Sequence, residues 1–533
     1  EFRRVLFRSV GRVFREYVEG KPAVVLSIVP NGALQLAAQE QNFTAPERDI
    51  PDSYGDEDEA LALRPVDDGL DRSQRPTPGV NPVVELPAIW NTSLVNEVRV
   101  LMVPNPETPT VTILANFDMG QRDEPPGKAG VAALTAQLMG EATQQRSAAE
   151  FSEELKRIGA SISLAPGQYE TSVSLNVLTK HVERGVELMM ERILEPLFTE
   201  EDFTRIKSQT IEGLMQNRKT PDGLANRAFS AVMYGPEHPL SYPMNGLPDS
   251  VAAITLDDVR TFYAQHIPQH LTGLLVSTSL EQAETIEMLK PFAQLETVAV
   301  SRETIDGMVP IDQRQIYLVD KEGAAQSSLR MGHDALPFDA TGDYYRAGLM
   351  NFILGGTFNS RLNLNLREDK GYTYGARSGF QGGPEFGGFG FSSEVNKDAT
   401  AASVSEVLKE LEAYVEDGMT EDDFTFMRNA IGQRDALQYE TPYRKLGLMS
   451  SILRYDLPLD YRTQQKAILQ ETDLSTLNRL ASELIQPEKM AIVIVGDEAS
   501  IRPELEALGM PIVRLDEDGL LIDPDETVKQ DSP

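Results

Sequence analysis

The sequence predicts an α+β protein made of two homologous α/β sandwich domains in tandem, each a sheet with helices packed on one face. Segments that alternate apolar and polar residues with a period of two are mixed with longer amphipathic segments of helical period. The same order of strands and helices occurs twice along the chain, which is typical of a duplication. Hydrophobic residues make up 41% of the 533 residues, which is enough to build more than one core.

Net charge and composition exclude several classes of function. The formal net charge is −33 at pH 7, which argues against a nucleic-acid partner because a phosphate backbone requires a basic surface. Solubility explains this charge most simply. No run of about 18 apolar residues occurs, so no membrane span is predicted. The chain has no cysteine, which excludes disulfides, cysteine nucleophiles and thiolate metal sites.

Residues 1–36 are predicted to lie outside the two repeats. They begin with "EFRRVLFRS", which resembles a cloning or assembly scar, and no initiator methionine precedes it. Val24–Val29 is a short run rich in β-branched residues, which predicts a strand that has no partner before it. We therefore interpret residues 1–36 as a possible scar plus the C-terminal remnant of an upstream domain of the same kind, and we expect the chain to be a fragment.

Residues 37–92 have the composition of a Pro-rich acidic linker. Six prolines lie between residues 46 and 82, and Asp56–Glu59 is an unbroken acidic cluster. Such a segment is stiffened by proline and too polar to build a core of its own.

The first repeat is predicted at 93–302. Its strands and helices follow one another in the order strand, strand, helix, helix, hairpin, and then a series of amphipathic helices before a last strand and helix. The predicted strands are 96–104, 110–120, 161–166, 170–178 and 271–278, and the predicted helices are 128–140, 148–158, 181–196, the stretch after 199, 256–265 and 282–289.

The second repeat is predicted at 303–515 with the same order. The predicted strands are 314–320, 327–336, 372–380, 387–395 and 490–497, and the predicted helices are 343–354, 360–367, 401–415, 421–438, 445–453 and 474–484. The glycine-rich stretch 382–391 is interpreted as a surface turn, with substrate contact as the less favoured alternative. Residues 516–533 are predicted to form a frayed acidic tail.

A local match supports the duplication. "TEEDFTRI" begins at Thr199 and "TEDDFTFM" begins at Thr420, each at the start of a predicted helix that follows a long helix. In each copy a threonine takes the N-cap position and an acidic residue lies three positions later, so that hydroxyl and carboxylate can accept the free N–H groups of the first turn.

The segment 354–380, "LGGTFNSRLNLNLREDKGYTYGARSGF", resembles the C-terminal signature of the pitrilysin/insulinase (M16) metallopeptidases. The segment "HPLSYPMNGLPDSV" at 238–251 and the duplicated unit are also similar to this family, over residues 93–515. The resemblance implies M16-type (LuxS/MPP-like) domains that enclose a chamber for an unfolded peptide. It also implies that one half of the enzyme carries an inverted zinc motif, His-x-x-Glu-His, with a distal glutamate, whereas the other half is degenerate and contributes an arginine and a tyrosine.

The zinc motif of this family is degenerate here. When the helix "GKAGVAALTAQLMGEAT" is aligned on its Gly130, the three motif positions are Ala133, Ala136 and Gln137, none of which is a plausible zinc ligand or base. The five histidines form no His-x-x-Glu-His motif, and "HIPQH" at 266–270 contains a proline that argues against an uninterrupted helix. We therefore expect no cofactor in this chain, and zinc in a missing N-terminal half.

By the same resemblance, Arg367 is the arginine and Tyr374 the tyrosine of the degenerate half. Peptide hydrolysis builds negative charge on the scissile carbonyl oxygen, and a phenol or a guanidinium can donate to it. Two alternatives are structural: an arginine at a helix end can complement the helix dipole, and a tyrosine on a strand can be a core aromatic. Tyr372 is the local competitor, because it has the same parity as Tyr374 along a strand.

These inferences predict the C-terminal, non-zinc half of a fused or paired M16-type metalloendopeptidase, inactive on its own. Its expected partners are a zinc-binding M16 half and an unfolded peptide, and a periplasmic or exported location is expected. An alternative is a non-proteolytic structural or assembly subunit with the same fold. A third is a complete enzyme with an unrecognised site. Substrate specificity is not predicted.

Overall fold

The computed structural model describes residues 2–30, 32–38, 71, 79, 86–298 and 305–522. The chain divides into two compact units, Glu1–Thr77 and Pro78–Pro533. The first unit contains one long helix, α1 (Phe2–Tyr17). The predicted strand Val24–Val29 is wrong, because residues 21–30 have no regular structure and the side chain of Val24 is 99% exposed. A strand needs a neighbouring strand to pair its backbone N–H and C=O groups, and no described strand pairs with residues 24–29.

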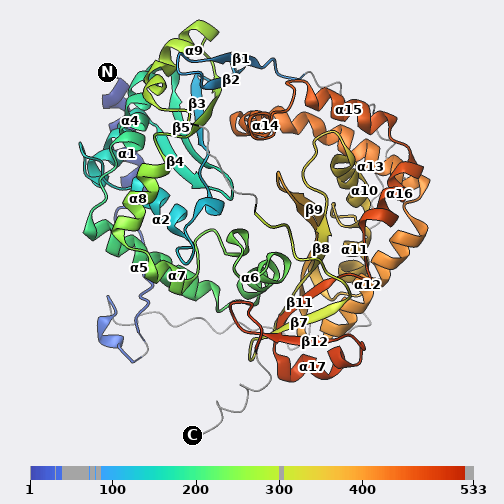
Figure 1. Cartoon of the computed structure of the whole chain (residues 1–533). Helices are drawn as coiled ribbons and strands as arrows, with labels where there is room; N and C mark the ends of the chain where they lie inside the picture. Colours follow the sequence, from blue (N-terminus) through green and yellow to red (C-terminus); the bar gives the residue numbers. More distant parts are fainter. Residues whose placement is uncertain are drawn as a thin grey trace. The chain divides into compact units, whose positions relative to one another are not determined.

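The second unit contains two mixed six-stranded sheets, which confirms the predicted fold class. The first sheet, whose strands β1 to β5 are labelled in Figure 1, has the strand order β1-β2-β6-β3-β5-β4. Its strands are β1 (Trp90–Ser93), β2 (Arg99–Pro104), β3 (Thr110–Phe117), β4 (Ser161–Pro166), β5 (Thr171–Leu178) and β6 (Leu271–Thr278). Strand β1 begins inside the range predicted as linker, most of which lies outside the described residues.

The second sheet has the order β12-β7-β11-β8-β10-β9. Its strands are β7 (Gln315–Asp320), β8 (Gln326–Ala335), β9 (Thr373–Gly382), β10 (Gly387–Asn396), β11 (Ala491–Gly496) and β12 (Ile512–Leu515). In the first sheet β6 lies between β2, to which it is parallel, and β3, to which it is antiparallel. In the second sheet β11 lies between β7 and β8 in the same way. The pairing therefore repeats as the sequence predicts. The edges differ, since β1 is antiparallel to β2 whereas β12 is parallel to β7.

Each sheet has a helical layer from its own repeat. The helices that pack their apolar residues into the first core are α2 (Val131–Met139), α3 (Ala148–Ile158), α4 (Val182–Leu194), α5 (Glu200–Asn217), α7 (Pro248–Ala253), α8 (Leu256–His266) and α9 (Gln282–Leu289). Those of the second core are α10 (Asp343–Leu354), α11 (Arg361–Asn363), α12 (Thr400–Asp417), α13 (Glu421–Arg434), α16 (Leu474–Leu484) and α17 (Glu498–Glu506), with α15 (Tyr461–Glu471) at its margin.

The opposite face of each sheet is covered by a helix from the other repeat. Helix α6 (Pro221–Tyr234) belongs to the first repeat but packs on β8 and β11 of the second sheet. Helix α14 (Pro442–Arg454) belongs to the second repeat but packs on β6 and β3 of the first. The central strands are therefore buried on both faces, which explains the unbroken hydrophobic run of β11.

Two glycines permit this close approach of helix to sheet. A Cβ on Gly273 of β6 would lie 2.6 Å from the Leu453 side chain of α14, and one on Gly332 of β8 would lie 2.7 Å from the Phe229 ring of α6. Both distances are far below van der Waals contact, so a larger residue at either position would force the Leu453 or Phe229 side chain to move.

Two further segments make contacts between the repeats. The glycine-rich stretch 382–391 forms a turn whose tip, Pro384 and Glu385, is exposed as predicted, and it also reaches the first repeat. Glu385 forms an ion pair with Arg122 at 3.2 Å, and the Phe386 ring lies 5.8 Å from that of Tyr234. The tail that was predicted to be frayed is described as far as residue 522. Within it, Asp518 pairs with Arg218 of the first repeat. Residues 523–533 lie outside the described part of the chain.

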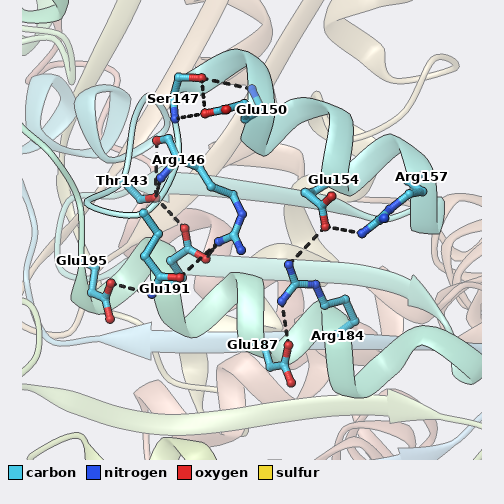
Figure 2. Close-up of polar contacts among 11 residues, drawn as sticks. Thr143, Arg146, Ser147, Glu150, Glu154, Arg157, Arg184, Glu187, Glu191 and Glu195 are labelled. Carbon is cyan, nitrogen blue, oxygen red and sulfur yellow. Dashed lines mark hydrogen bonds and ion pairs between the residues drawn. The ribbon is translucent and has the colours of Figure 1, made fainter.

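A polar network between α3 and α4 holds the outer helices of the first repeat together (Figure 2). Ser147 caps α3, and its backbone N–H donates to Glu150 at 3.0 Å. The buried carboxylate of Glu191 accepts from Thr143 Oγ1 at 2.5 Å and also pairs with Arg146. All carboxylates in this network have partners, which is the arrangement expected of a structural element.

We expect the exchanged helix α14 to contribute strongly to stability. Met449 of α14 is fully buried against the first sheet, so Met449→Ala should lower the free energy of unfolding by about 2–5 kcal/mol. Met215→Ala, at a site that is 50% exposed on α5, is the matched control and should change it by less than about 0.5 kcal/mol. Trp90 fluorescence reports on the first sheet, and far-UV circular dichroism reports on both. Separate transitions for the two signals would contradict the interlocked packing.

Candidate functional site

The three positions that align with the zinc motif, Ala133, Ala136 and Gln137, all lie on helix α2. Ala133 and Ala136 are buried in the first core, while Gln137 is exposed and its Oε1 accepts from Thr210 Oγ1 of α5 at 3.4 Å. Two methyl groups and one amide do not form a ligand set for Zn²⁺, which requires imidazole, thiolate or carboxylate groups. Within the described residues, no group of three or more His, Asp or Glu side chains is placed to hold a metal ion. The residues of α2 therefore do not fit zinc.

The N-terminus of α2 is fixed by an unusually tight backbone contact. Gly130 has a φ of 96°, and a Cβ on it would lie 2.6 Å from the carbonyl oxygen of Asn245. Gly246 has a φ of 77° and approaches Ala129 in return. The segment 238–251, which carries part of the family resemblance, thus holds the start of α2 in place, and only glycine satisfies both the conformation and the spacing.

No histidine lies on α2, and His333 and His270 hydrogen-bond to backbone groups elsewhere. His333 is buried, and its Nε2 accepts from the Gln486 N–H at 3.1 Å while its Nδ1 donates to the Asp334 carbonyl at 2.7 Å. Burial lowers the pKa of His333 below its ordinary value, which keeps the ring neutral. His266 is the last residue of α8, and His270 Nδ1 lies 2.6 Å from the Val298 carbonyl. The helix ends between these two histidines, as Pro268 predicts.

Arg367 lies in a π-helical turn, η6 (Leu364–Asp369), that continues the short helix α11. Its Nε is 3.3 Å from Glu368 Oε1, and its guanidinium lies over the Phe358 ring at 4.5 Å from the centroid. The Arg367 side chain is 34% exposed, and the Phe358 side chain is 60% exposed. π-Helical turns are rare and are frequently found at functional sites.

Tyr374 lies at the start of β9 with 89% of its surface exposed, so it is not a core aromatic. A β-bulge sets its direction: Thr373 pairs with Val395 and Ala376 with Ser393, so that two residues, Tyr374 and Gly375, oppose one residue of β10. In a regular strand Tyr374 and Ala376 would share a face, yet Ala376 is buried. The bulge therefore turns the phenol outward.

Tyr372 lies in a different environment, contrary to the expectation that it shares a face with Tyr374. It precedes the strand, and its ring packs partly buried against the second core. Its backbone N–H donates to the Leu366 carbonyl at 2.8 Å, which joins the bulge segment to the Arg367 turn. A second bond, from the Ala376 N–H to Asn363 Oδ1 at 3.0 Å, joins the same two segments.

The structure thus brings the Arg367 and Tyr374 segments together on the second repeat and places α2 on the first. The strong contacts of α2 are with α5, α8 and β4, whereas those of η6 are with α11, α12 and β9. Arg367 and Tyr374 both reach solvent from these joined segments, and Phe358 lies beside the arginine. A guanidinium and a phenol presented in this way can donate hydrogen bonds to the carbonyl groups of an extended peptide.

Sequence reasoning missed Glu124, whose carboxylate caps α2. It accepts from the Gly130 N–H at 3.0 Å and from the Ala132 N–H at 2.9 Å. Burial raises the pKa of Glu124 to about 7, although the two backbone hydrogen bonds act in the opposite direction. It lines a cavity of about 410 Å³ together with Glu237 and Tyr242. No sequence motif marks it, because its position depends on a loop that folds back onto the helix start.

The comparisons with known proteins agree with this architecture. Residues 99–243 match the family model for insulinase (peptidase family M16), and residues 253–431 match the model for the peptidase M16 inactive domain. The chain belongs to the M16 peptidase family. It contains both domain types of the M16 family, which corrects the expectation that it is only a C-terminal half.

The M16 relatives include proteins named as peptidases and one named as a non-peptidase. The chain is 24% identical to an uncharacterized zinc protease, YmxG, of Bacillus subtilis, over 53% of this chain and 68% of the relative. It is 21% identical to the non-peptidase homolog YmxG of Helicobacter pylori, over 69% of this chain and 85% of the relative. Among solved structures, a peptidase M16 inactive domain from Pseudomonas fluorescens superimposes with a TM-score of 0.70 and 22% identity, over 77% of this chain and 98% of that one.

The raised pKa of Glu124 predicts a pH-dependent stability. The folded state binds the proton more tightly than the unfolded state, so the stabilising contribution is complete below pH 4.5 and is lost as the pH rises through about 7. The free energy of unfolding of the parent chain should therefore fall by about 2–3 kcal/mol between pH 4.5 and pH 8. Glu124→Gln cannot ionise, so this fall should be absent in the variant. Chemical denaturation at several pH values measures this difference.

Glu150→Gln is the matched control with the opposite sign. The Ser147 backbone N–H lowers the pKa of Glu150, so its contribution is lost as the pH falls below 4.5. If the stability of Glu124→Gln follows that of the parent chain across the whole range, the carboxylate of Glu124 ionises normally and our account of its burial is wrong.

Proposed function

We propose that this chain is the non-zinc partner of an M16-type metallopeptidase and that it binds an unfolded peptide and presents Arg367 and Tyr374 to the scissile region. The zinc would be held by a separate M16 subunit that carries His-x-x-Glu-His. On its own, this chain is expected to cleave no peptide.

The exposure of Tyr374 is the observation that carries the proposal. A tyrosine buries much of its surface when its role is packing, yet Tyr374 is 89% exposed while Thr373 and Ala376 beside it are buried. A bulge is needed to place it there, and bulges often re-aim a side chain next to an active site. The exposed phenol has no packing role, which supports contact with a ligand.

Arg367 supports the same proposal through its surroundings. Its guanidinium is oriented by the Phe358 ring on one side and by Glu368 on the other, so part of its hydrogen-bonding fork remains available. A fixed fork binds backbone carbonyls or a carboxylate with less loss of side-chain entropy than a flexible amine does. Together the two side chains can hold an extended segment and stabilise negative charge on a carbonyl oxygen.

A second candidate function is a non-proteolytic assembly subunit. The name of the Helicobacter pylori relative, a non-peptidase homolog, favours this alternative. The same degenerate α2 supports both functions. The two functions differ in whether the exposed Tyr374 and Arg367 contribute to peptide cleavage or only to assembly.

The test uses this chain mixed with an M16 chain that carries the intact zinc motif. Tyr374→Phe removes only the hydroxyl, so we expect the turnover of a fluorogenic unstructured peptide to fall about 100-fold with little change in assembly. Tyr372→Phe is the matched control, because that tyrosine is half-buried in the second core, and its turnover should stay within about twofold of the parent pair.

Arg367→Lys and Arg367→Met complete this experiment. Lysine keeps the charge but loses the fork, so Arg367→Lys should recover only part of the activity that Arg367→Met loses. If all three variants assemble with the partner and cleave as fast as the parent pair, the catalytic proposal is refuted and the assembly function is favoured.

A further inference from the structure

A cavity of about 770 Å³ lies in the second repeat, outside the site described above. Its walls are formed by α10, α13 and α15 together with the loop that precedes α10. We call it the α10 cavity. Its volume falls within the range typical of small-molecule sites and is almost twice that of the cavity beside Glu124.

One wall of the α10 cavity is aromatic and apolar. Phe338, Tyr344 and Tyr345 lie on the α10 side, and Leu349 and Leu469 extend this surface. Burial raises the pKa of Tyr345 to about 12, so its hydroxyl is a neutral donor at physiological pH.

The opposite wall has an excess of positive charge. Asp435 pairs with two cations, Arg462 at 3.4 Å and Lys466 at 2.9 Å. Asp339, the other carboxylate of the lining, accepts from the backbone N–H groups of Thr341 and Gly342 at the start of α10. With Arg428, the lining carries three cations and two carboxylates, in a chain whose formal net charge is −33.

The cationic wall is held rigidly in place. Arg462 donates to Tyr439 Oη at 3.1 Å and to Gln465 Oε1 at 2.6 Å. Gln465 is buried and in turn donates to the Ala340 carbonyl at 2.6 Å. Because the guanidinium is already oriented, a ligand that binds there does not have to order it.

A third cation reaches the cavity from α13. Arg428 donates one hydrogen bond, to the Gln470 carbonyl at 2.6 Å, and its guanidinium lies over the Phe424 ring. It makes no ion pair with any described residue, so its charge is available in the cavity.

A glycine in the middle of α10 lies beside the open space of the cavity. Gly348 lines it, and a Cβ at this position would meet no atom within 4 Å. Glycine within a helix costs about 1 kcal/mol relative to alanine, so its presence has no local benefit for the helix. The open space above Gly348 is the part of the cavity that a ligand would occupy.

We propose that the α10 cavity binds an organic anion with an aromatic or aliphatic body and one carboxylate or phosphate group. The body would lie against Tyr345 and Leu349 over Gly348, and the anionic group would lie against Arg462, Lys466 and Arg428. This proposal is independent of the proposed peptidase role, because none of these residues contributes to the Arg367–Tyr374 segments.

The test measures binding to the whole chain by isothermal titration calorimetry. Phenyl phosphate and phenylacetate are the anionic probes, inorganic phosphate tests the charge alone, and benzylamine tests the apolar body with the opposite charge. We expect both aromatic anions to bind at least about tenfold more tightly than inorganic phosphate, and benzylamine not to bind.

Variants locate the binding site. Gly348→Trp fills the space above α10 and should weaken both aromatic anions at least about tenfold, whereas Gly348→Ala should change their affinity by less than about threefold. Lys466→Met should weaken both anions at least about fivefold without blocking the cavity. Thermal unfolding of each variant shows whether the fold is retained.

Three results would overturn the proposal. They are absence of binding by both aromatic anions, equal binding of benzylamine and phenylacetate, and unchanged affinity in both a folded Gly348→Trp and Lys466→Met. If Gly348→Trp does not fold, the comparison between Lys466→Met and Gly348→Ala decides the question alone.

Discussion

The reciprocal packing of α6 and α14 is the constraint on which the rest of the second unit depends. Each helix is joined covalently to one sheet and buries its apolar face on the other, so neither sheet is complete without the opposite repeat. Burial on both faces explains why the central strands are apolar at successive positions, and Gly273 and Gly332 give each helix the room to approach. The turn 382–391 and the tail then add polar contacts between two repeats that are already interlocked.

Much of the fold could be predicted because each element carries its own pattern. The hairpin of β4 and β5 alternates with period two, and Thr199 and Thr420 cap equivalent helices, so local residues suffice. The exchange of helices could not be predicted, because the spacing of Leu446 and Met449 shows that α14 is amphipathic but not which sheet it covers. The predicted strand Val24–Val29 does not form, for a related reason. Its composition favours a strand, but a strand forms only where another strand pairs with it.

The candidate site divides in the same way. Family spacing selects Arg367 and Tyr374, and the residues on α2 show directly that zinc ligands are absent from that helix. Their roles and the domain boundaries remain predictions. The environments of these residues come from long-range pairing: the bulge needs β10, the orientation of Arg367 needs Phe358, and the proton affinity of Glu124 needs a loop that folds onto α2. Residue type and spacing are local, whereas exposure and proton affinity depend on the whole tertiary structure.

The bulge at Tyr374 and Gly375 has a consequence for how such a surface can change over time. On each side of the bulge the side chains of β9 alternate regularly, but this alternation is shifted by one residue across the bulge. The hydrogen-bonded pairing with β10 continues on both sides. Loss of Gly375 would place Tyr374 alone opposite Glu394, between the buried Thr373 and Ala376, so regular alternation would keep the phenol outward. A single-codon deletion at this point would therefore preserve both the sheet and the exposure of Tyr374.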